Sequence, residues 1–401
     1  MNYESEIYNM SRKKIFNGKK LKTARMYRGK TIDVLAQETK INKKDILAFE
    51  EDKYKPVVEN EMKLSNALKF PREYFFENDN IKVVIENTHI RPESPIPRVE
   101  EISYKEKLVM THKLISFIER YIKFPEMKLP DNLTKYDDME ELATKVRRFW
   151  GLGDGPIGNM VTLLEVNGIS ISGMNIDKRG ALSFTQKQSI ERNPRYLVSL
   201  GNDRKSATIR NYDLAYELAY IVSVEAGISS KKFSKDEFAC AFLLPKETFF
   251  EDLANVEELN DYVELKKKWI VPISAMVLRA YQLEVINYKK YMYLIREMEK
   301  QGWLKKEPLD DNIKSTSPAL LKKSVEMLID NKIMSGTGLV DNLANSGLNI
   351  YPEDVEILLG LKEGMLSPKG NGKKSNVTKV NFKNKNSDLK KFIKLITLLA
   401  R

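Results

Sequence analysis

The sequence predicts a mainly α-helical protein with a small β-sheet, an α+β chain of several domains. Helical periodicity, with apolar residues at spacings of three and four, recurs along much of the 401 residues. A few short stretches, 169–171, 181–186 and 195–200, have the pattern of strands, and we expect them to form a small antiparallel sheet. The length suits two or three domains, and a hydrophobic content of 42% suits buried cores.

Composition and periodicity divide the chain into five segments. They are a helical bundle at 1–76, a proline-containing linker at 77–103, an α+β domain at 104–308, a helical subdomain at 309–362, and a basic segment with a C-terminal amphipathic helix at 363–401. The linker is assigned because Pro92, Pro95 and Pro97 prevent a continuous helix there.

The basic charge of the chain is concentrated near its N-terminus. Lys and Arg total 67 against 56 Asp and Glu, a net charge of +11, and residues 11–56 alone carry fourteen basic and six acidic residues. A basic excess confined to one segment indicates a nucleic-acid partner. One cysteine fits a reducing compartment, and no long apolar run indicates a membrane span or signal core. We therefore expect a cytoplasmic protein without membrane association.

The N-terminal segment contains the start and stop signals of short helices. Four helices are predicted, at about 17–28, 32–39, 43–51 and 58–69. Gly29 suits the left-handed position that ends the first helix. Thr31 and Asn42 are the predicted N-caps of the second and third helices, and Val34 and Leu35 are expected to face the core.

This order of helices, with G-x-T before the second and I-x-x-x-E in the third, resembles the helix-turn-helix domain of the Xre family over about residues 17–76. The resemblance implies that the third helix enters the major groove of duplex DNA. It places the following residues at the DNA: Lys30, Thr31, Ile32, Asn42, Lys43, Lys44, Asp45, Leu47, Ala48, Lys53 and Lys55. It also implies a homodimer on paired half-sites.

Different roles are expected within this set. Lys43 and Lys44 can donate to guanine, and Leu47 can contact a thymine methyl group. Lys30, Lys53 and Lys55 are expected near phosphates, which position the protein without specifying sequence. At position 32, many members of the family have Gln where this chain has Ile, so the site preference of relatives does not transfer.

The stretch 207–222, ATIRNYDLAYELAYIV, has the pattern of a buried helix. Together with 234–245, it resembles the active-site segments of the ImmA/IrrE family of zinc metallopeptidases, in which the helix carries H-E-x-x-H. That motif places two imidazoles on one helical face to bind zinc, and its Glu acts as general base. Here Tyr216 and Tyr220 occupy the His positions around Glu217, and Ser234 occupies the position of a third ligand.

The replacements imply that the zinc chemistry is lost. A neutral phenol is a poor zinc ligand, and the chain has two His, His89 and His112, and one Cys, Cys240. We therefore expect no metal, no cofactor and no enzymatic activity, with Glu217 vestigial. His89, in the linker, is expected to serve packing or hydrogen bonding. A buried ion pair with Arg210 is the expected role of Glu217.

The two resemblances together, over about 17–76 and 100–308, imply a repressor fused to a peptidase-like body. The expected function is a sequence-specific transcriptional regulator, a repressor of a prophage, mobile element or toxin-antitoxin-like locus, that binds an operator in double-stranded DNA. The body is expected to sense or dock an inducer or an antirepressor protein or peptide. The expected docking groove is lined by Arg210, Tyr216, Glu217, Tyr220 and Ser234.

Two other functions remain open. The body could be an active hydrolase of the ImmA/IrrE type that uses Glu217 in an unusual site, or an antitoxin domain that masks a toxin. The amphipathic segment 387–400 has three interpretations: packing onto the core of the chain, contact with a partner or second copy, or binding to a membrane surface.

Overall fold

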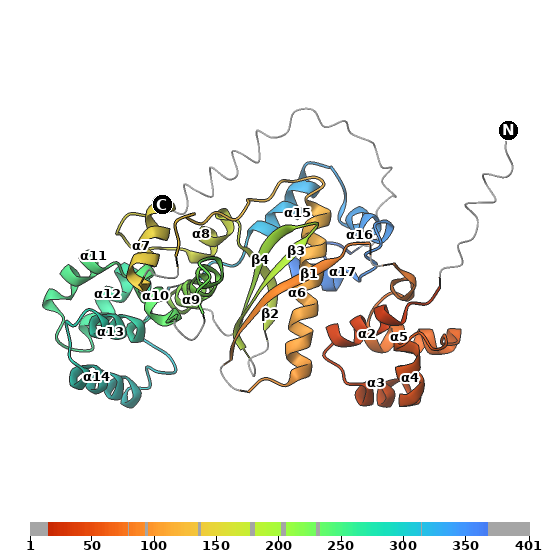
Figure 1. Ribbon diagram of the computed structural model, residues 1–401, viewed down its shortest axis with the longest axis horizontal. Coiled ribbons are helices and arrows are strands. Elements are labelled where there is room, and N and C mark those ends of the chain that lie inside the picture. Colours follow the sequence, from red (N-terminus) through yellow and green to blue (C-terminus); the bar gives the residue numbers. More distant parts are fainter. Residues whose placement is uncertain are drawn as a thin grey trace.

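The computed structural model describes residues 15–78, 80–92, 95–134, 138–176, 181–201, 206–229, 233–313 and 315–367. The predicted C-terminal helix at 387–400 lies outside these residues. Within them, a four-stranded sheet stands at the centre, with helices on both of its faces and a helical bundle at the N-terminal end (Figure 1). The α+β class that the sequence predicts is confirmed.

Helices make up most of the described structure. Those of the N-terminal bundle are α2 (Gly18–Tyr27), α3 (Ile32–Thr39), α4 (Lys43–Glu50), α5 (Val58–Leu68) and the 3-10 helix η1 (Arg72–Phe76). Those of the body are α6 (Arg98–Ile118), α7 (Met139–Phe149), α8 (Met160–Val166), α9 (Ala207–Glu225), α10 (Lys235–Leu243), α11 (Lys246–Asp252), η2 (Leu253–Asn255), α12 (Asp261–Trp269), α13 (Ile273–Gln282) and α14 (Tyr288–Lys300). Those of the C-terminal region are α15 (Leu320–Asp330), α16 (Gly336–Asn345) and α17 (Pro352–Leu359).

The sheet has the order β1-β3-β4-β2 and is mixed. Its strands are β1 (Val83–Pro92), β2 (Ser170–Ile176), β3 (Ala181–Ile190) and β4 (Asn193–Gly201). β1 and β4 pair antiparallel with β3, but β2 pairs parallel with β4. The expectation of an antiparallel sheet is therefore wrong at one edge, because the β3–β4 hairpin places β4 between β3 and β2.

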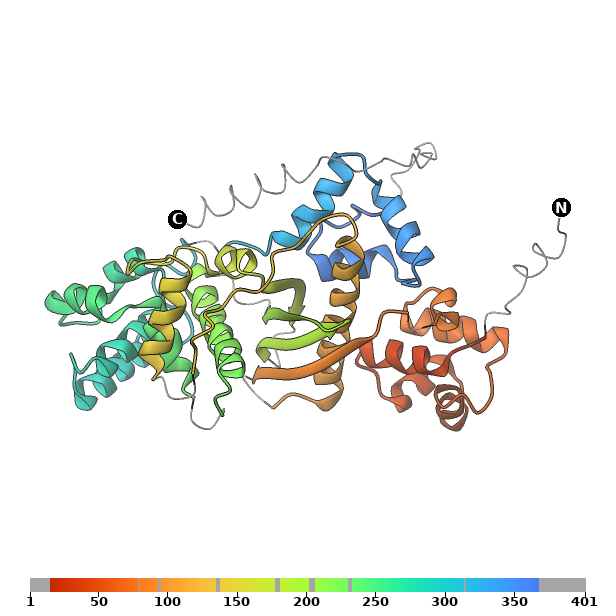
Figure 2. The same cartoon turned by 45° about the horizontal axis from the view of Figure 1, so that its top comes forward.

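Alternation along β3 gives its two faces different environments. α6 packs on one face and α9 on the other, as Figures 1 and 2 both show. Phe184 faces α6, where its ring contacts Tyr104, whereas Ser183 and Thr185 face α9. Side chains of a strand point alternately to opposite faces, so these neighbours are separated by the sheet.

The segment 77–103 is not a linker. Its middle is β1, the edge strand of the sheet, and its end is the first turn of α6. The prolines do not prevent this, because Pro92 ends the strand and Pro97 stands immediately before α6, where a missing backbone donor costs little. His89 and Arg91 are therefore strand residues with defined faces.

The N-terminal bundle is joined to the C-terminal region by buried polar contacts. Arg28, at the end of α2, forms a two-pronged ion pair with Asp354 of α17, with N···O distances of 2.7 and 2.5 Å. Glu77, just after η1, accepts from the backbone N–H of Asn349 at 2.6 Å and pairs with Lys20 at 3.4 Å. α2 also packs on α6, and apolar residues of both helices belong to one continuous core.

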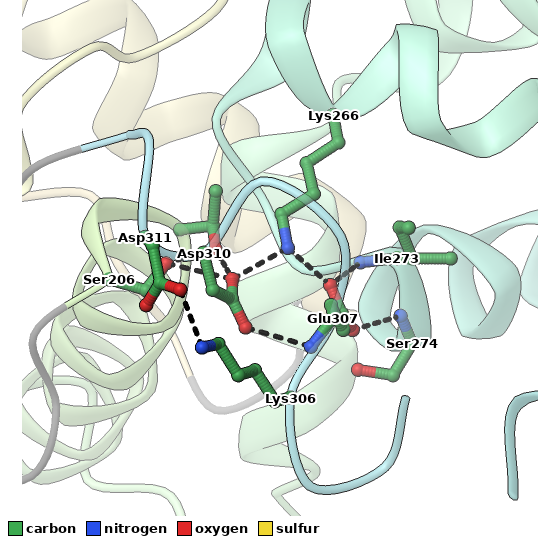
Figure 3. A network of polar contacts seen from close by, with 9 residues as sticks. Ser206, Lys266, Ile273, Ser274, Lys306, Glu307, Asp310 and Asp311 are labelled. Carbon is green, nitrogen blue, oxygen red and sulfur yellow. Dashed lines mark hydrogen bonds and ion pairs between the residues drawn. The ribbon is translucent and has the colours of Figure 1, made fainter. Parts of the chain in front are cut away.

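A second polar cluster fixes the start of α9 (Figure 3). Lys266, which is fully buried, donates to Glu307 and Asp310 at 2.7 Å each. Glu307 also accepts from the backbone N–H of Ile273 at the start of α13, and Asp310 accepts from Ser206, the residue before α9. One ammonium group faces two carboxylates, and the backbone donors at the start of α13 together with the Ser206 hydroxyl stabilise the remaining negative charge.

Candidate nucleic-acid interface and the covered centre of the body

One face of α4 is open to solvent and carries basic and apolar groups. Lys43 and Lys44 are exposed, and 39% of Leu47 is exposed. The opposite face of the helix buries Ile46 and Phe49 in the core of the bundle. In Figure 1, α3 and α4 lie on the side of the bundle away from α17, so the contacts with the body leave this face uncovered.

Local capping positions α3 and α4 as the sequence predicts. The side chain of Thr31 accepts from the backbone N–H of Val34, and that of Asn42 accepts from Lys44. Gly29 has a φ of +63°, the left-handed conformation expected at the end of α2. These caps satisfy backbone donors that the first turn of a helix leaves unpaired.

Several residues placed at the DNA by resemblance are engaged elsewhere. Lys30 pairs with Glu38 and donates to the carbonyl of Ala67 at 2.8 Å. Asp45 accepts from the hydroxyl of Tyr54. To contact DNA, each of these groups would have to give up a contact within the bundle.

Two expectations for this bundle are wrong. Ala48 is 8% exposed and belongs to the inner side of α4, because it lies one residue beyond the open face at Leu47. Val34 is 41% exposed, because the inner side of α3 is formed by Leu35 and Thr39 instead. Lys53 and Lys55 pair with Glu51 and Asp52, and Ile32 is half-buried in the first turn of α3.

The centre of the body is a buried carboxyl group on α9. Glu217 is fully buried and accepts from the hydroxyl of Ser183 and, at 2.5 Å, from that of Thr185, both on β3. Burial raises the pKa of Glu217 to about 7, and the two hydroxyl donors offset part of that shift. The ion pair expected with Arg210 is not what holds this carboxyl, since Arg210 donates to the carbonyl of Thr316 instead.

β1 covers the two tyrosines that flank Glu217. The ring of His89 stacks on that of Tyr220 with centroids 4.6 Å apart. The guanidinium of Arg91 lies 4.1 Å from the ring centroid of Tyr216 and pairs with Asp213 at 2.6 Å. The groove expected between α9 and the sheet is therefore filled by the edge strand at these rings.

The histidine at this centre adds no positive charge at neutral pH. Burial, together with the positive charges of Lys235 and Arg91, lowers the pKa of His89 to about 4. His89 is thus uncharged at neutral pH, and its contact of 3.9 Å with Glu217 is not an ion pair. Its Nε2 atom is buried and has no hydrogen-bond partner among the described residues.

The donors at this centre do not suit zinc. Phenols stand at Tyr216 and Tyr220, and Ser234 is the N-cap of α10, where its hydroxyl accepts from the backbone N–H of Glu237. Among the described residues, no group of three or more His, Cys, Asp or Glu side chains could hold a metal ion. Cys240 is fully buried in the core beside α13.

Sequence reasoning missed four residues of this centre: His89, Arg91, Ser183 and Thr185. The alternation in 181–186 does place Ser183 and Thr185 on one face of a strand. Nothing in that pattern states which helix covers the face. The sequence places His89 in a linker, and no local sequence pattern predicts that its ring stacks on Tyr220.

Comparison with known families identifies the bundle. Residues 18–81 match a protein-family model described as a helix-turn-helix domain. The chain contains a helix-turn-helix domain. No curated protein and no solved structure matches the chain at a significant level. Helix-turn-helix domains bind DNA with their second motif helix, which is α4 here, so the match supports DNA binding by the open face described above.

None of the described helices is both long enough and apolar enough to cross a membrane.

Proposed function

We propose that this protein is a sequence-specific transcriptional regulator that binds duplex DNA through the first turns of α4. The observation that carries the proposal is the open face formed by Lys43, Lys44 and Leu47 within the matched helix-turn-helix domain. Lys side chains can donate to guanine O6 and N7, and an apolar side chain can contact the thymine methyl group.

Lys43 and Lys44 differ in whether an ion pair must open before the side chain can contact DNA. Lys43 pairs with Asp33 at 2.6 Å, but both side chains are more than half exposed, so the pair stabilises little and can open. Lys44 forms no ion pair with a described residue. The buried pair of Arg25 with Glu50 holds α4 against α2 at 2.6 Å and so fixes the position of both lysines.

We further propose that the protein is a repressor, a homodimer on paired half-sites, whose body responds to an inducer or antirepressor. Support comes from the covalent connection between the body and the helix-turn-helix domain. Residues 78–82 connect Glu77, which contacts Asn349, to β1, which covers the centre at Glu217. A ligand that prefers one arrangement of β1 would therefore shift the position of the helix-turn-helix domain.

We also propose that the body performs no zinc-peptidase chemistry. The proposal rests on the chemistry of Tyr216, Tyr220 and Ser234 at the expected ligand positions and on the cover that His89 forms over Tyr220. A hydrolase that used Glu217 would need water or substrate to reach this carboxyl, and the Glu217 side chain has no exposed surface. Glu217→Gln is therefore expected to leave DNA binding unchanged.

The test begins with selection of bound sequences from random duplex DNA by the full chain. On the selected operator, Lys43→Ala with Lys44→Ala should raise Kd at least ~30-fold, because two base contacts contribute about 1–3 kcal/mol each. Lys63→Ala, an exposed change on α5, is the matched control and should leave Kd within about twofold. Fluorescence anisotropy at fixed salt measures both.

Two results would contradict the proposal. One is an operator Kd that the double substitution leaves unchanged. The other is a selection that enriches no sequence at all, which would leave only non-specific binding to phosphates.

A further inference from the structure

A cluster of tyrosines is exposed at the end of the body opposite the helix-turn-helix domain. The ring of Tyr281 on α13 lies 5.2 Å from that of Tyr291 and 6.1 Å from that of Tyr288, both on α14. Tyr281, Tyr288 and the nearby Tyr293 are 38%, 62% and 46% exposed. Gathered aromatic rings on a surface are typical of a place where another segment docks.

A cavity of about 640 Å³ opens beside these rings, between the start of α7, α10 and the α13–α14 turn. Four carboxylates line it: Asp138, Glu140, Glu237 and Glu284. The single positive charge in the lining is Arg279, and it is already paired with Glu140 at 2.8 Å. The cavity therefore has a net negative charge in a chain that is basic as a whole.

Among the described residues, the buried side-chain atom of this lining that has no partner is an acceptor. The Oε1 atom of Gln282 is buried and has no hydrogen-bond partner among the described residues. The carboxylates of Glu237 and Glu284 are in exposed residues and form no ion pair with a described residue. A buried acceptor without a donor is costly, so the complementary ligand is a cation that carries N–H groups, such as a lysine side chain.

The chain itself contains a segment with this chemistry. Residues 368–401 lie outside the described structure and carry ten Lys or Arg residues and one Asp. Apolar residues recur there at spacings of three and four: Leu389, Phe392, Ile393, Ile396 and Leu399. Lys390, Lys391 and Lys394 alternate with them. Twenty-one residues precede this stretch, and fully extended they can span up to ~70 Å.

We propose that residues 389–399 dock on the tyrosine cluster and place lysine side chains in the acidic cavity. The apolar stripe would cover the exposed rings, and the ammonium groups would supply the donors that Gln282, Glu237 and Glu284 lack. Ammonium groups also interact favourably with the faces of tyrosine rings. This contact is independent of whether the protein regulates transcription.

The test uses full-length chains in which two cysteines are introduced. Lys289→Cys lies beside the tyrosine cluster, and Thr397→Cys lies off the apolar stripe. A short bis-maleimide should join them within one chain at least tenfold faster than it joins Lys322→Cys on α15 with Thr397→Cys. Both Lys289 and Lys322 are at least partly exposed, and the native Cys240 is fully buried and so protected. Peptide mapping by mass spectrometry identifies the products.

Substitution of the carboxylates tests whether the acidic cavity takes part in the contact. Glu237→Gln with Glu284→Gln should slow the Lys289–Thr397 reaction at least tenfold. Glu247→Gln with Glu251→Gln, two exposed carboxylates outside the cavity, should leave its rate within about twofold. Circular dichroism melting of each variant confirms that the fold is retained.

Three outcomes would overturn the proposal. Equal rates at Lys289 and Lys322 would show that the segment samples both places without preference. A rate that ignores Glu237 and Glu284 would remove the acidic cavity from the contact. Products that join two chains would assign the cavity to the segment of a second copy.

Discussion

At the residue scale, Glu217 combines complete burial with a pKa near neutrality. Its pKa in the folded chain is about 7, against about 4.5 for an unperturbed Glu, because burial disfavours the charged form. The folded state therefore binds this proton more tightly than the unfolded state. The stabilisation is fully present below about pH 4.5 and is lost as the pH rises through 7.

Glu217→Gln should reveal this dependence, because Gln does not titrate. The free energy of unfolding of the variant, relative to the native chain, should increase by about 3 kcal/mol from pH 4.5 to pH 8. Urea unfolding at several pH values measures the difference. Glu264→Gln, an exposed change on α12, serves as control and should give a flat difference. A flat difference for Glu217→Gln as well would mean that its pKa is not raised.

Single residues were predictable from sequence where their role is local. Thr31 and Asn42 cap their helices and Gly29 ends one, because these interactions reach only two or three residues along the chain. The partners of Glu217 were not predictable. Ser183 and Thr185 are more than thirty residues away, and only the packing of α9 on β3 brings them to the carboxyl.

At the scale of elements, β1 is an edge strand that covers the centre of the body with one histidine. His89 contributes a stacked ring but also a buried Nε2 atom that has no hydrogen-bond partner in the described part of the chain. His112 of α6 is the counterpart on the other face of the sheet, where its Nδ1 atom contacts the Oε1 atom of Gln188 at 3.1 Å. The two histidines thus differ in whether their polar atoms are satisfied.

This difference predicts opposite effects for the same substitution. His89→Phe should stabilise the protein by about 1 kcal/mol, since it keeps the ring and removes the unsatisfied atom. His112→Phe should destabilise it by about 1–3 kcal/mol, since the Gln188 oxygen then loses its partner. Chemical unfolding at pH 7 measures both. Destabilisation by His89→Phe would show that Nε2 has a partner in solution, such as a water molecule.

Helices were easier to predict than strands in this chain. α2 to α5 and α9 lie close to their expected ranges. β1 was missed because a strand rich in polar residues and followed by prolines has the composition of a linker. The parallel pairing of β2 was also missed, since pairing partners are decided by the whole sheet and not by the strand.

At the scale of the whole molecule, the helix-turn-helix domain is fixed to the C-terminal region through Arg28 and Asp354. Tyr27 adds a hydrogen bond to the same carboxylate at 3.2 Å, and burial is the main reason that its own pKa is raised. No sequence pattern predicts a contact between residues separated by 326 positions. The contact of the N-terminal bundle with the C-terminal region could therefore not be predicted from the sequence.

Arg28→Lys should loosen this closure, because an ammonium cannot form the two-pronged pair of a guanidinium. Hydrogen exchange in α17 should accelerate, with a loss of protection of about 1–3 kcal/mol, while α3 and α4 keep theirs. Arg25→Lys is the matched comparison within the domain and should instead accelerate exchange in α4. Exchange that Arg28→Lys leaves unchanged in α17 would show that the apolar contacts alone hold the domain.

The pair of Arg28 and Asp354 also sets an order of events during synthesis. A ribosome adds roughly 5–20 residues per second, so the 326 positions between the two partners take about 16–65 s to translate. The DNA-binding domain leaves the ribosome long before α17 exists to hold it. For that interval the nascent chain presents α4 on a domain that is not yet tethered to its own C-terminal region.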